Sequence, residues 1–191
     1  MDVIQLLKKD HKMMKEMFKK FENLKGRTVQ KKLDLIVQIK QALTAHAQVE
    51  EELVYPAFME NRSMKEQVHE ALEEHHVTKM LLAELDELQP DDERYDAKVK
   101  VLCEYLMHHV KEEEKEMFPA AQKRLSTKRL TALGEEVKAR RNELRGKDKD
   151  EDRQKKDSRR DKATENIPDM KESEGKNVKN MKDQRSKQHA A

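Results

Sequence analysis

Two segments of the chain repeat one pattern at an offset of 63 residues. The first is HAQVEEELVYP, residues 46–56, and the second is HVKEEEKEMFP, residues 109–119. In both segments a glutamate follows the histidine after four positions and a proline follows it after ten. A further histidine precedes each segment, His11 in one case and His75 in the other, and apolar residues follow both at matching distances. The chain is therefore predicted to contain a duplicated unit, in which one histidine is followed by an HxxxE motif.

Apolar residues recur at intervals of three and four along most of the chain, which is the spacing of one helix face. This periodicity predicts four long helices, over about residues 2–25, 28–58, 63–88 and 93–121. Ser126 or Thr127 is expected to cap a shorter fifth helix that ends near residue 145. Long helices with short connections predict an all-α fold, an antiparallel up-down four-helix bundle built from a duplicated helix pair.

The composition agrees with long helices and argues against several kinds of partner. Charged residues make up 42% of the chain and aromatic residues 4%, with four glycines and four prolines. The net charge of +2 gives a balanced surface, which favours neither a nucleic-acid nor a membrane partner. There is no signal-peptide pattern and no apolar run of the roughly 18 residues that a membrane span needs. Since the single Cys103 also fits a reducing compartment, a cytoplasmic location is expected.

The chain is expected to have three parts with different roles. Residues 1–122 would form the bundle, residues 123–145 the additional helix, and residues 146–191 a charged tail. The tail contains no Leu, Phe, Tyr or Trp. Such a segment cannot bury enough apolar surface to offset its conformational entropy. We therefore expect a disordered C-terminal tail, and its sequence does not identify a protein partner.

Six polar side chains fall on helix rows that are otherwise apolar and face the predicted core. In the first helix, for example, His11 lies between Leu7 and Met14 on the inward row. Burying an ionised carboxylate without a partner costs several kcal/mol or more, and bound divalent cations would compensate for this. Residues four apart share a helix face, so each HxxxE motif can direct both of its ligands at one point. The candidate metal ligands are His11, His46, Glu50, His75, His109 and Glu113.

The chemistry of these residues narrows the choice of metal. Imidazole and carboxylate ligands without a thiolate suit iron or manganese, and also zinc. Six ligands exceed the four of a tetrahedral zinc site, which favours a dinuclear centre. A single HxxxE motif on a charged helix is most often a surface pair, whereas two copies on core rows favour a metal site. The neighbouring acids and the other histidines of the bundle are expected at the surface: Glu51, Glu52, Glu112, Glu114, His69, His76 and His108.

The order of these motifs, with an aromatic residue and proline closing each HxxxE segment, resembles the hemerythrin-like, or HHE cation-binding, family over residues 1–122. The resemblance implies a di-iron centre inside a four-helix bundle, with the six candidate residues as ligands. Oxygen-carrying hemerythrins have a fifth histidine one turn after the histidine of the third helix, where this chain has Lys79. They also have Asp at the position of Glu113. The simplest function, reversible oxygen carriage, is therefore not the one that these residues favour.

The duplication suggests how two non-haem irons would be shared. Each copy would supply both histidines of one iron, and the two glutamates would bridge the irons together with an oxo or hydroxo group. Both irons then have an open position, which favours a small diatomic ligand or peroxide as partner. The expected function is the binding or sensing of O2 or NO. The alternatives are an enzyme that acts on peroxide or NO, and donation of iron to damaged iron centres, since the pattern also resembles the repair-of-iron-centres proteins.

Overall fold

The computed structural model describes residues 1–24 and 29–144. In these ranges the regular elements are helical and no strand occurs, so the prediction of an all-α fold is confirmed. The predicted C-terminal tail, residues 146–191, lies outside the described residues. Six α-helices are bounded as follows: α1 Val3–Glu22, α2 Val29–Val49, α3 Tyr55–Met59, α4 Lys65–Glu87, α5 Tyr95–Glu112 and α6 Phe118–Arg124. Residues 127–144 are also helical.

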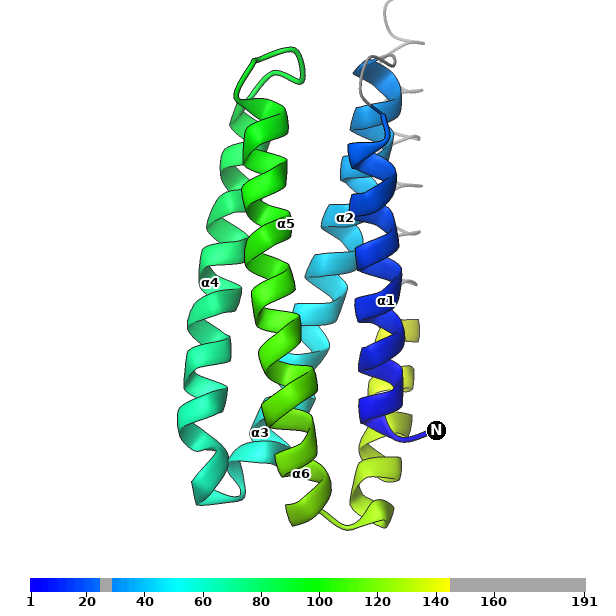
Figure 1. The fold of residues 1–191 in the computed structure, drawn as a ribbon. Helices are drawn as coiled ribbons and strands as arrows, with labels where there is room; N and C mark the ends of the chain where they lie inside the picture. The colour runs from blue at the N-terminus through cyan, green and yellow to red at the C-terminus, as the bar shows by residue number, and fades with distance from the viewer. Residues whose placement is uncertain (25–28, 145–191) are drawn as a thin grey trace, which may run out of the picture. The chain divides into compact units, whose positions relative to one another are not determined.

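The four long helices lie side by side, and each runs in the opposite direction to the one before it (Figure 1). α1 packs against α2, α4 packs against α5, and α1 also contacts α5. The two helices of each repeated unit are therefore direct neighbours. Short connections enforce this arrangement, because helices joined by a few residues can pack only on each other.

The apolar core consists of two clusters that are separated along the helices by polar side chains. In α1, Ile4 and Leu7 belong to one cluster, Met14 and Phe18 belong to the other, and His11 lies between them. Each fully buried side chain of this size contributes about 1.5–3 kcal/mol through removal of its surface from water. Two apolar layers thus hold the four helices on either side of one polar layer.

A π-helical segment follows the HxxxE motif in each copy. η1 (Glu50–Val54) follows α2, and η3 (Glu113–Met117) follows α5. In each segment a backbone N–H, that of Tyr55 or Phe118, donates to the carbonyl five residues earlier. The next residue is a proline, which has no N–H to donate to an α-helical ladder. Uninterrupted helices over 28–58 and 93–121 were predicted, and that prediction was wrong because the wider turn replaces α-helical bonding at these two places.

The π turn determines which residue faces the core after each motif. At about 100° per residue, Tyr55 would lie on the opposite face of a straight helix from His46, nine positions earlier. The extra residue in the π turn rotates the following segment back by about 100°. As a result, Tyr55 and its counterpart Phe118 are fully buried. The π turn thus places an aromatic side chain from each copy next to the polar layer.

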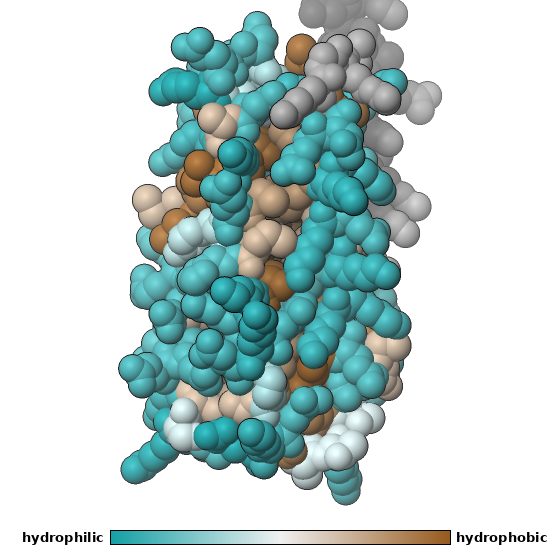
Figure 2. Space-filling view, viewed as in Figure 1, coloured by the Kyte–Doolittle hydropathy of each residue, from teal (hydrophilic) through white to brown (hydrophobic). Residues whose placement is uncertain are grey.

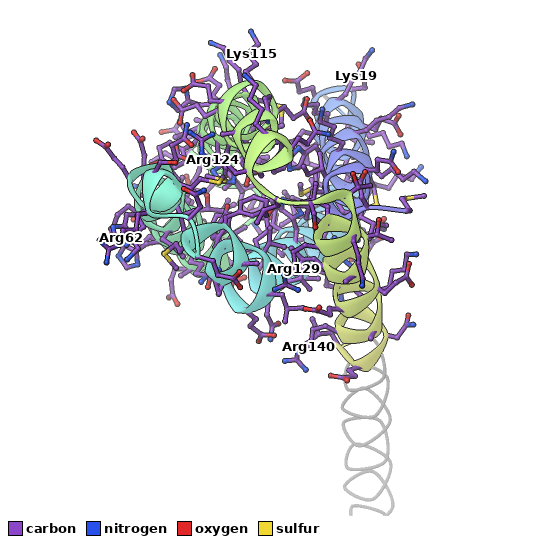
Figure 3. The ribbon with its side chains drawn as sticks, turned by 90° about the horizontal axis from the view of Figure 1, so that it is seen from below. Lys19, Arg62, Lys115, Arg124, Arg129 and Arg140 are labelled. Carbon is purple, nitrogen blue, oxygen red and sulfur yellow. The ribbon has the colours of Figure 1, made fainter. Side chains whose placement is uncertain are left out.

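The helix of residues 127–144 begins as the sequence predicts. The hydroxyl of Ser126 accepts a hydrogen bond from the backbone N–H of Arg129 at 3.2 Å, which is an N-cap. Leu130, Leu133 and Val137 of this helix are buried against the first apolar cluster. Figure 3 shows the helix beside α1, with Arg129 and Arg140 on its surface. The added helix therefore belongs to the same folded unit as the four long helices.

The surface is mostly hydrophilic on the face drawn in Figure 2, and apolar side chains show there only in small patches. Within residues 1–24 and 29–144, none of the helices combines the length and the apolar character that crossing a membrane requires.

We expect Gly134→Ala to destabilise the fold by about 1–3 kcal/mol, because Gly134 meets the chain backbone directly. A Cβ atom at this position would lie 2.5 Å from the Met1 carbonyl oxygen and 3.0 Å from the Val3 nitrogen. This clash with backbone outweighs the gain of about 1 kcal/mol that alanine brings to a helix. Urea denaturation of the full chain measures the change. Ala132→Val, an exposed and larger change in the same helix, is the control and should cost less. Equal or higher stability of Gly134→Ala would contradict the close packing.

Candidate metal centre

The four long helices bring the six predicted residues together inside the bundle. α1, α2, α4 and α5 each supply one histidine, and each π segment begins with one of the two glutamates. All six residues are at most 4% exposed. They form two overlapping groups whose ligand atoms lie within 4.8 Å of one another: His11, His46, Glu50 and Glu113, and Glu50, His75 and His109. Glu50 belongs to both groups.

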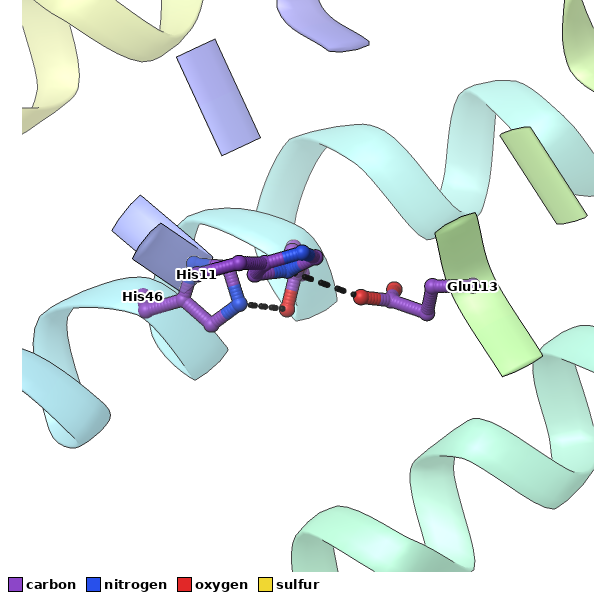
Figure 4. Close-up of side chains that lie close together, drawn as sticks. His11, His46 and Glu113 are labelled. Atoms are coloured by element: carbon purple, nitrogen blue, oxygen red, sulfur yellow. Dashed lines mark ion pairs between the residues drawn. The ribbon is translucent and has the colours of Figure 1, made fainter. Parts of the chain in front are cut away.

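The Nε2 atoms of the histidines point towards the glutamate carboxylates. The Nε2 atom of His11 lies 3.2 Å from Glu113 Oε2, and that of His46 lies 3.2 Å from Glu50 Oε2. Figure 4 shows His11 and Glu113 facing each other across the interior. The Nε2 atoms of His75 and His109 are only 3.3 Å apart, and His75 Nε2 is also 3.4 Å from Glu50 Oε2. Six possible ligands thus converge on one small volume.

Each histidine also has a carboxylate at its other ring nitrogen. A carboxylate can only accept, so it favours the tautomer that carries its proton on Nδ1 and leaves a lone pair on Nε2, facing inwards. This arrangement of an outer carboxylate and an inner ring nitrogen is typical of metal-binding histidines. The distances from Nδ1 to the carboxylate oxygen are 2.9 Å for His11–Glu114, 3.4 Å for His46–Asp10, 2.9 Å for His75–Glu51 and 2.7 Å for His109–Glu74.

The outer carboxylates were not all expected from the sequence. Glu51 and Glu114 were predicted to lie at the surface, and both are partly exposed, but their contacts with the His75 and His11 rings were not predicted. Glu51 follows Glu50 and contacts His75 of the second copy, and Glu114 follows Glu113 and contacts His11 of the first copy. Asp10 precedes His11 and contacts His46 of the same copy, and Glu74 precedes His75 and contacts His109 of the same copy. The duplication therefore extends to the outer carboxylates, which gives the whole site an approximate twofold symmetry.

Basic side chains hold three of the four outer carboxylates in place. Lys79 donates to both oxygens of Glu51 at 2.7 Å, so the residue at the position of the fifth histidine of oxygen carriers supports His75 from outside. Arg141, from the helix of residues 127–144, donates to both oxygens of Asp10. Lys15 lies 3.7 Å from Glu114. Sequence analysis gave no sign of the Arg141 contact, since that helix lies outside the repeat.

Several inner atoms have no hydrogen-bond partner within the described part of the chain. They are His11 Nε2, His46 Nε2, both carboxylate oxygens of Glu50, and Glu113 Oε2. A buried polar atom without a partner costs about 1–3 kcal/mol, and more when it is charged. The nitrogen and oxygen atoms that lack a partner are the kinds of atoms that bind a metal cation. The residues present therefore fit one or more metal cations at this position.

The charges of the centre shift the pKa values of its groups in opposite directions. Burial lowers the pKa of His75, but the carboxylates of Glu50 and Glu51 outweigh it and raise the pKa to about 9. Burial raises the pKa of Glu113, but the nearby imidazoles outweigh it and hold the pKa at about 2. The pKa of Tyr55 is raised well above its ordinary value, first by burial and then by the carboxylates around it. The centre contains more carboxylates than fixed cations. It therefore favours the binding of additional positive charge, which protons or metal cations can supply.

One difference between the two copies breaks the symmetry of the site. The Tyr55 hydroxyl donates to Glu113 Oε1 at 2.9 Å and lies 3.4 Å from His75 Nε2. At the equivalent position Phe118 stacks on the His11 ring, with centroids 5.7 Å apart and planes at 11°. Glu113 therefore has a hydroxyl partner, whereas both oxygens of Glu50 have none among the described residues. Tyr55 was not predicted from the sequence, although the aromatic residue of each motif was the available signal.

The remaining histidines of the bundle lie outside this centre. His69 and His76 are exposed, as predicted. His108 is also exposed, and it lies beside Glu112 and Glu74 in a third group of possible ligands. That group touches the centre only through Glu74.

The sequence matches the family described as Hemerythrin HHE cation binding domain over residues 2–121. Among solved structures, a Hemerythrin HHE cation binding domain-containing protein from Mycobacterium kansasii is similar in fold, with a TM-score of 0.67 and 24% identity. The similarity covers 77% of this chain and 89% of that chain. A curated protein named DNA nickase, from Nostoc sp. strain PCC 7120, is 28% identical over 141 residues. The match covers 73% of this chain and 39% of the relative, so this chain spans about two fifths of that protein's length.

Proposed function

The chain belongs to the hemerythrin HHE cation-binding domain family, and we propose that it is a non-haem di-iron protein that binds or senses O2 or NO. In this proposal each copy supplies the two histidines of one iron, and the two glutamates bridge the irons. Residues 1–122 would form this domain as an antiparallel four-helix bundle built from a duplicated helix pair. Residues 123–145 would be an added helix, and residues 146–191 a separate tail.

The observation that carries the proposal is the set of inner atoms without hydrogen-bond partners. Glu50 is fully buried, and neither of its oxygens accepts a hydrogen bond within the described chain, although the His46 and His75 Nε2 atoms lie 3.2 and 3.4 Å from Oε2. A structural role alone does not explain a buried carboxylate in this state, because its desolvation costs several kcal/mol and an imidazole with its proton on Nδ1 has no Nε2 proton to donate to it. A pair of cations between Glu50, Glu113 and the four imidazoles would compensate for that cost. Two overlapping ligand groups that share Glu50 favour two ions over one.

The protein's own residues would determine what the irons can bind. When bound, the irons would supply reversible electron transfer and open positions for a small ligand. The outer carboxylates would keep each Nε2 lone pair directed inwards, and the apolar clusters would exclude bulk water from the interior. Only a small, uncharged molecule would pass between the packed helices without a large desolvation cost. These constraints favour a diatomic ligand over a bulky or charged substrate.

A second function, catalysis on peroxide or NO, is favoured by Tyr55 and Lys79. Because Lys79 occupies the place of a fifth histidine and pairs with Glu51 instead, neither ion would gain a third imidazole. The Tyr55 hydroxyl lies inside the centre and could give a proton to a reacting ligand through its contact with Glu113. The whole-protein activity of the Nostoc DNA nickase belongs to a longer relative, and no described residue argues for it here.

Rapid mixing of the iron-loaded protein with O2, NO and hydrogen peroxide separates these two functions. A binder gives one spectral change per centre and then stops, whereas an enzyme consumes many equivalents of peroxide or NO. If the protein is an enzyme, His46→Ala should abolish turnover and Tyr55→Phe should slow it at unchanged iron content. Tyr55→Phe is a conservative test because the equivalent position in the other copy is already Phe118. A protein that responds to none of the three ligands would contradict both functions.

Arg141→Met is expected to lower the metal affinity of the centre by up to about 10-fold, the lower end of the effect of losing an outer carboxylate, because Arg141 holds the carboxylate that orients His46. Retention of metal during dialysis against a chelator measures the effect. Arg140→Met is the matched control, since Arg140 is in the same helix but pairs with Glu52 and Glu143 at the surface. Arg141→Lys should retain most of the affinity. Identical retention in the Arg140 and Arg141 variants would show that the added helix does not support the centre.

A further inference from the structure

Glu74 differs from the other three outer carboxylates in the side chains that it contacts on the side facing away from the centre. Lysine or arginine side chains pair with Asp10, Glu51 and Glu114. Glu74 has no such partner within residues 1–24 and 29–144, although it is only 8% exposed and accepts from His109 Nδ1 at 2.7 Å. Three of the four outer carboxylates therefore pair with a lysine or arginine side chain, and Glu74 pairs with none in the described ranges.

The side chains behind Glu74 are themselves of the kind that binds metals. His108 Nε2 lies 3.0 Å from Glu112 Oε1, four residues along α5, and 3.9 Å from Glu74 Oε1. Ligand atoms of all three residues lie within 4.8 Å of one another. The ring of His108 is 57% exposed, so an ion could reach it from solvent. One imidazole and two carboxylates thus meet at the protein surface, next to the buried centre.

The equivalent place in the other copy has Asp10 as the counterpart of Glu74 but lacks the imidazole and the second carboxylate. The repeat aligns His108 with Ala45 and Glu112 with Val49. Val49 is fully buried and belongs to the same apolar cluster as Leu130 and Leu133 of the helix of residues 127–144. The added helix therefore covers one side of the duplicated site, while the corresponding side of the second copy carries an exposed imidazole and an acid. The duplication alone does not account for the group at this position.

We propose that Glu74, His108 and Glu112 form a second, peripheral site for a divalent first-row transition-metal cation. Imidazole with two carboxylates suits Fe²⁺, Mn²⁺ or Zn²⁺, and the exposed position leaves room for water ligands, which favours weak and reversible binding. The bound ion would give Glu74 the positively charged partner that lysine or arginine gives the other three outer carboxylates. The two carboxylates also create a negative potential there, and after burial they are the main cause of the raised pKa of Tyr105.

The shared carboxylate would connect the two sites. Glu74 Oε2 accepts from His109, a candidate ligand of the buried centre, while Oε1 faces His108 outside. An ion bound at the surface would therefore lie one carboxylate away from the interior, which is a suitable first stop for a cation on its way into the centre. This connection rests on the proposed function, whereas the peripheral site itself does not.

Titration of the purified full chain with Zn²⁺ tests the peripheral site. The double variant His108→Ala, Glu112→Val gives the second copy the residues of the first, so it is expected to fold. By calorimetry the wild-type chain should bind one more equivalent of Zn²⁺ than this variant, with the same content of tightly held metal in both. His69→Ala, which removes an exposed histidine elsewhere on the bundle, should bind as the wild type does. Equal Zn²⁺ binding by the wild type and the double variant would overturn the proposal.

Two further measurements keep this test independent of the buried centre and of variant folding. Glu50→Gln, which should empty the buried centre, should still bind the additional Zn²⁺, so failure of the di-iron proposal and failure of this one are distinguishable. In the wild-type chain, NMR signals of the His108 ring should shift on addition of Zn²⁺ before those of His69 and His76. Equal shifts of all three rings would show only nonspecific binding and would overturn the proposal.

Discussion

Glu50→Gln is expected to release the metal from the buried centre, whereas Glu51→Gln, one position further along, only weakens binding. Glu50 is shared by both groups of possible ligands, and neither of its buried oxygens has a hydrogen-bond partner among the described residues. Glutamine has nearly the same shape but removes the negative charge and one oxygen donor. Glu51 touches no inner atom and acts on His75 from outside, at Nδ1. Loss of such an outer partner costs about 10–100-fold in affinity, and loss of Glu50 should cost more than that.

Metal content after purification, followed by competition with a chelator, measures both changes. Glu52→Gln is the surface control, because Glu52 pairs with Arg140 away from the interior. Metal retention should be highest in Glu52→Gln, lower in Glu51→Gln and lowest in Glu50→Gln. Equal retention by the Glu50 and Glu52 variants would mean that Glu50 is not a ligand, and the assignment of the centre would be wrong.

Removal of the metal is expected to lower the free energy of unfolding by about 4 kcal/mol for each site that is filled at a thousandfold excess over its dissociation constant. The metal-free chain must bury two glutamates and four histidines between its apolar clusters without the cations that compensate for them. For a chain of this size, each kcal/mol corresponds to about 2–4 °C in melting temperature. Calorimetry before and after treatment with a chelator should therefore show a fall of more than about 10 °C.

The Glu50→Gln variant provides the control for this second prediction. Since its buried centre should hold no metal, treatment with the chelator should leave its melting temperature nearly unchanged. A general effect of the chelator on stability would instead appear in both proteins. If the wild-type chain melts at the same temperature with and without the chelator, the six buried residues have a purely structural role.

The main features of the centre could be predicted because they follow from helix periodicity. His11 and Glu113 lie on rows that are otherwise apolar, so their burial followed from the 3–4 spacing alone. The repeat then placed equivalent residues on equivalent helices, and the structure brings all six predicted residues into contact range. In a regular helix the spacing of residues determines which side chains share a face over many turns. The inner part of the site could therefore be predicted from the sequence.

The outer part of the site could not be read in this way, because it depends on departures from regular geometry and on distant packing. Tyr55 reaches the centre only because a π turn rotates it inwards, whereas a regular helix would direct it away. Glu51 and Glu114 directly follow the candidate ligands Glu50 and Glu113, and on a helix adjacent residues do not share a face. Even so, their carboxylates contact the His75 and His11 rings of the other copy. Arg141 reaches Asp10 from 131 residues away, which no local pattern indicates.

The contact of Arg141 also suggests why the chain carries a helix beyond the matched family region. That region ends at residue 121, and residues 127–144 pack on the start of α1 and close one side of the duplicated site. The other side is left open at Glu74 and His108. The added helix thus gives the two halves of a symmetric site different surroundings, and together with Tyr55 this makes the two proposed ions inequivalent.

The count of irons per chain, taken with the near-ultraviolet and visible spectrum, tests the central claim most directly. After expression in iron-supplemented medium, we expect two irons per chain and a charge-transfer band in the near ultraviolet. Both should be lost in His46→Ala and in Glu50→Gln and retained in the exposed-site variant His76→Ala. A chain that binds no iron under these conditions, or that keeps two irons in both ligand variants, would contradict the account.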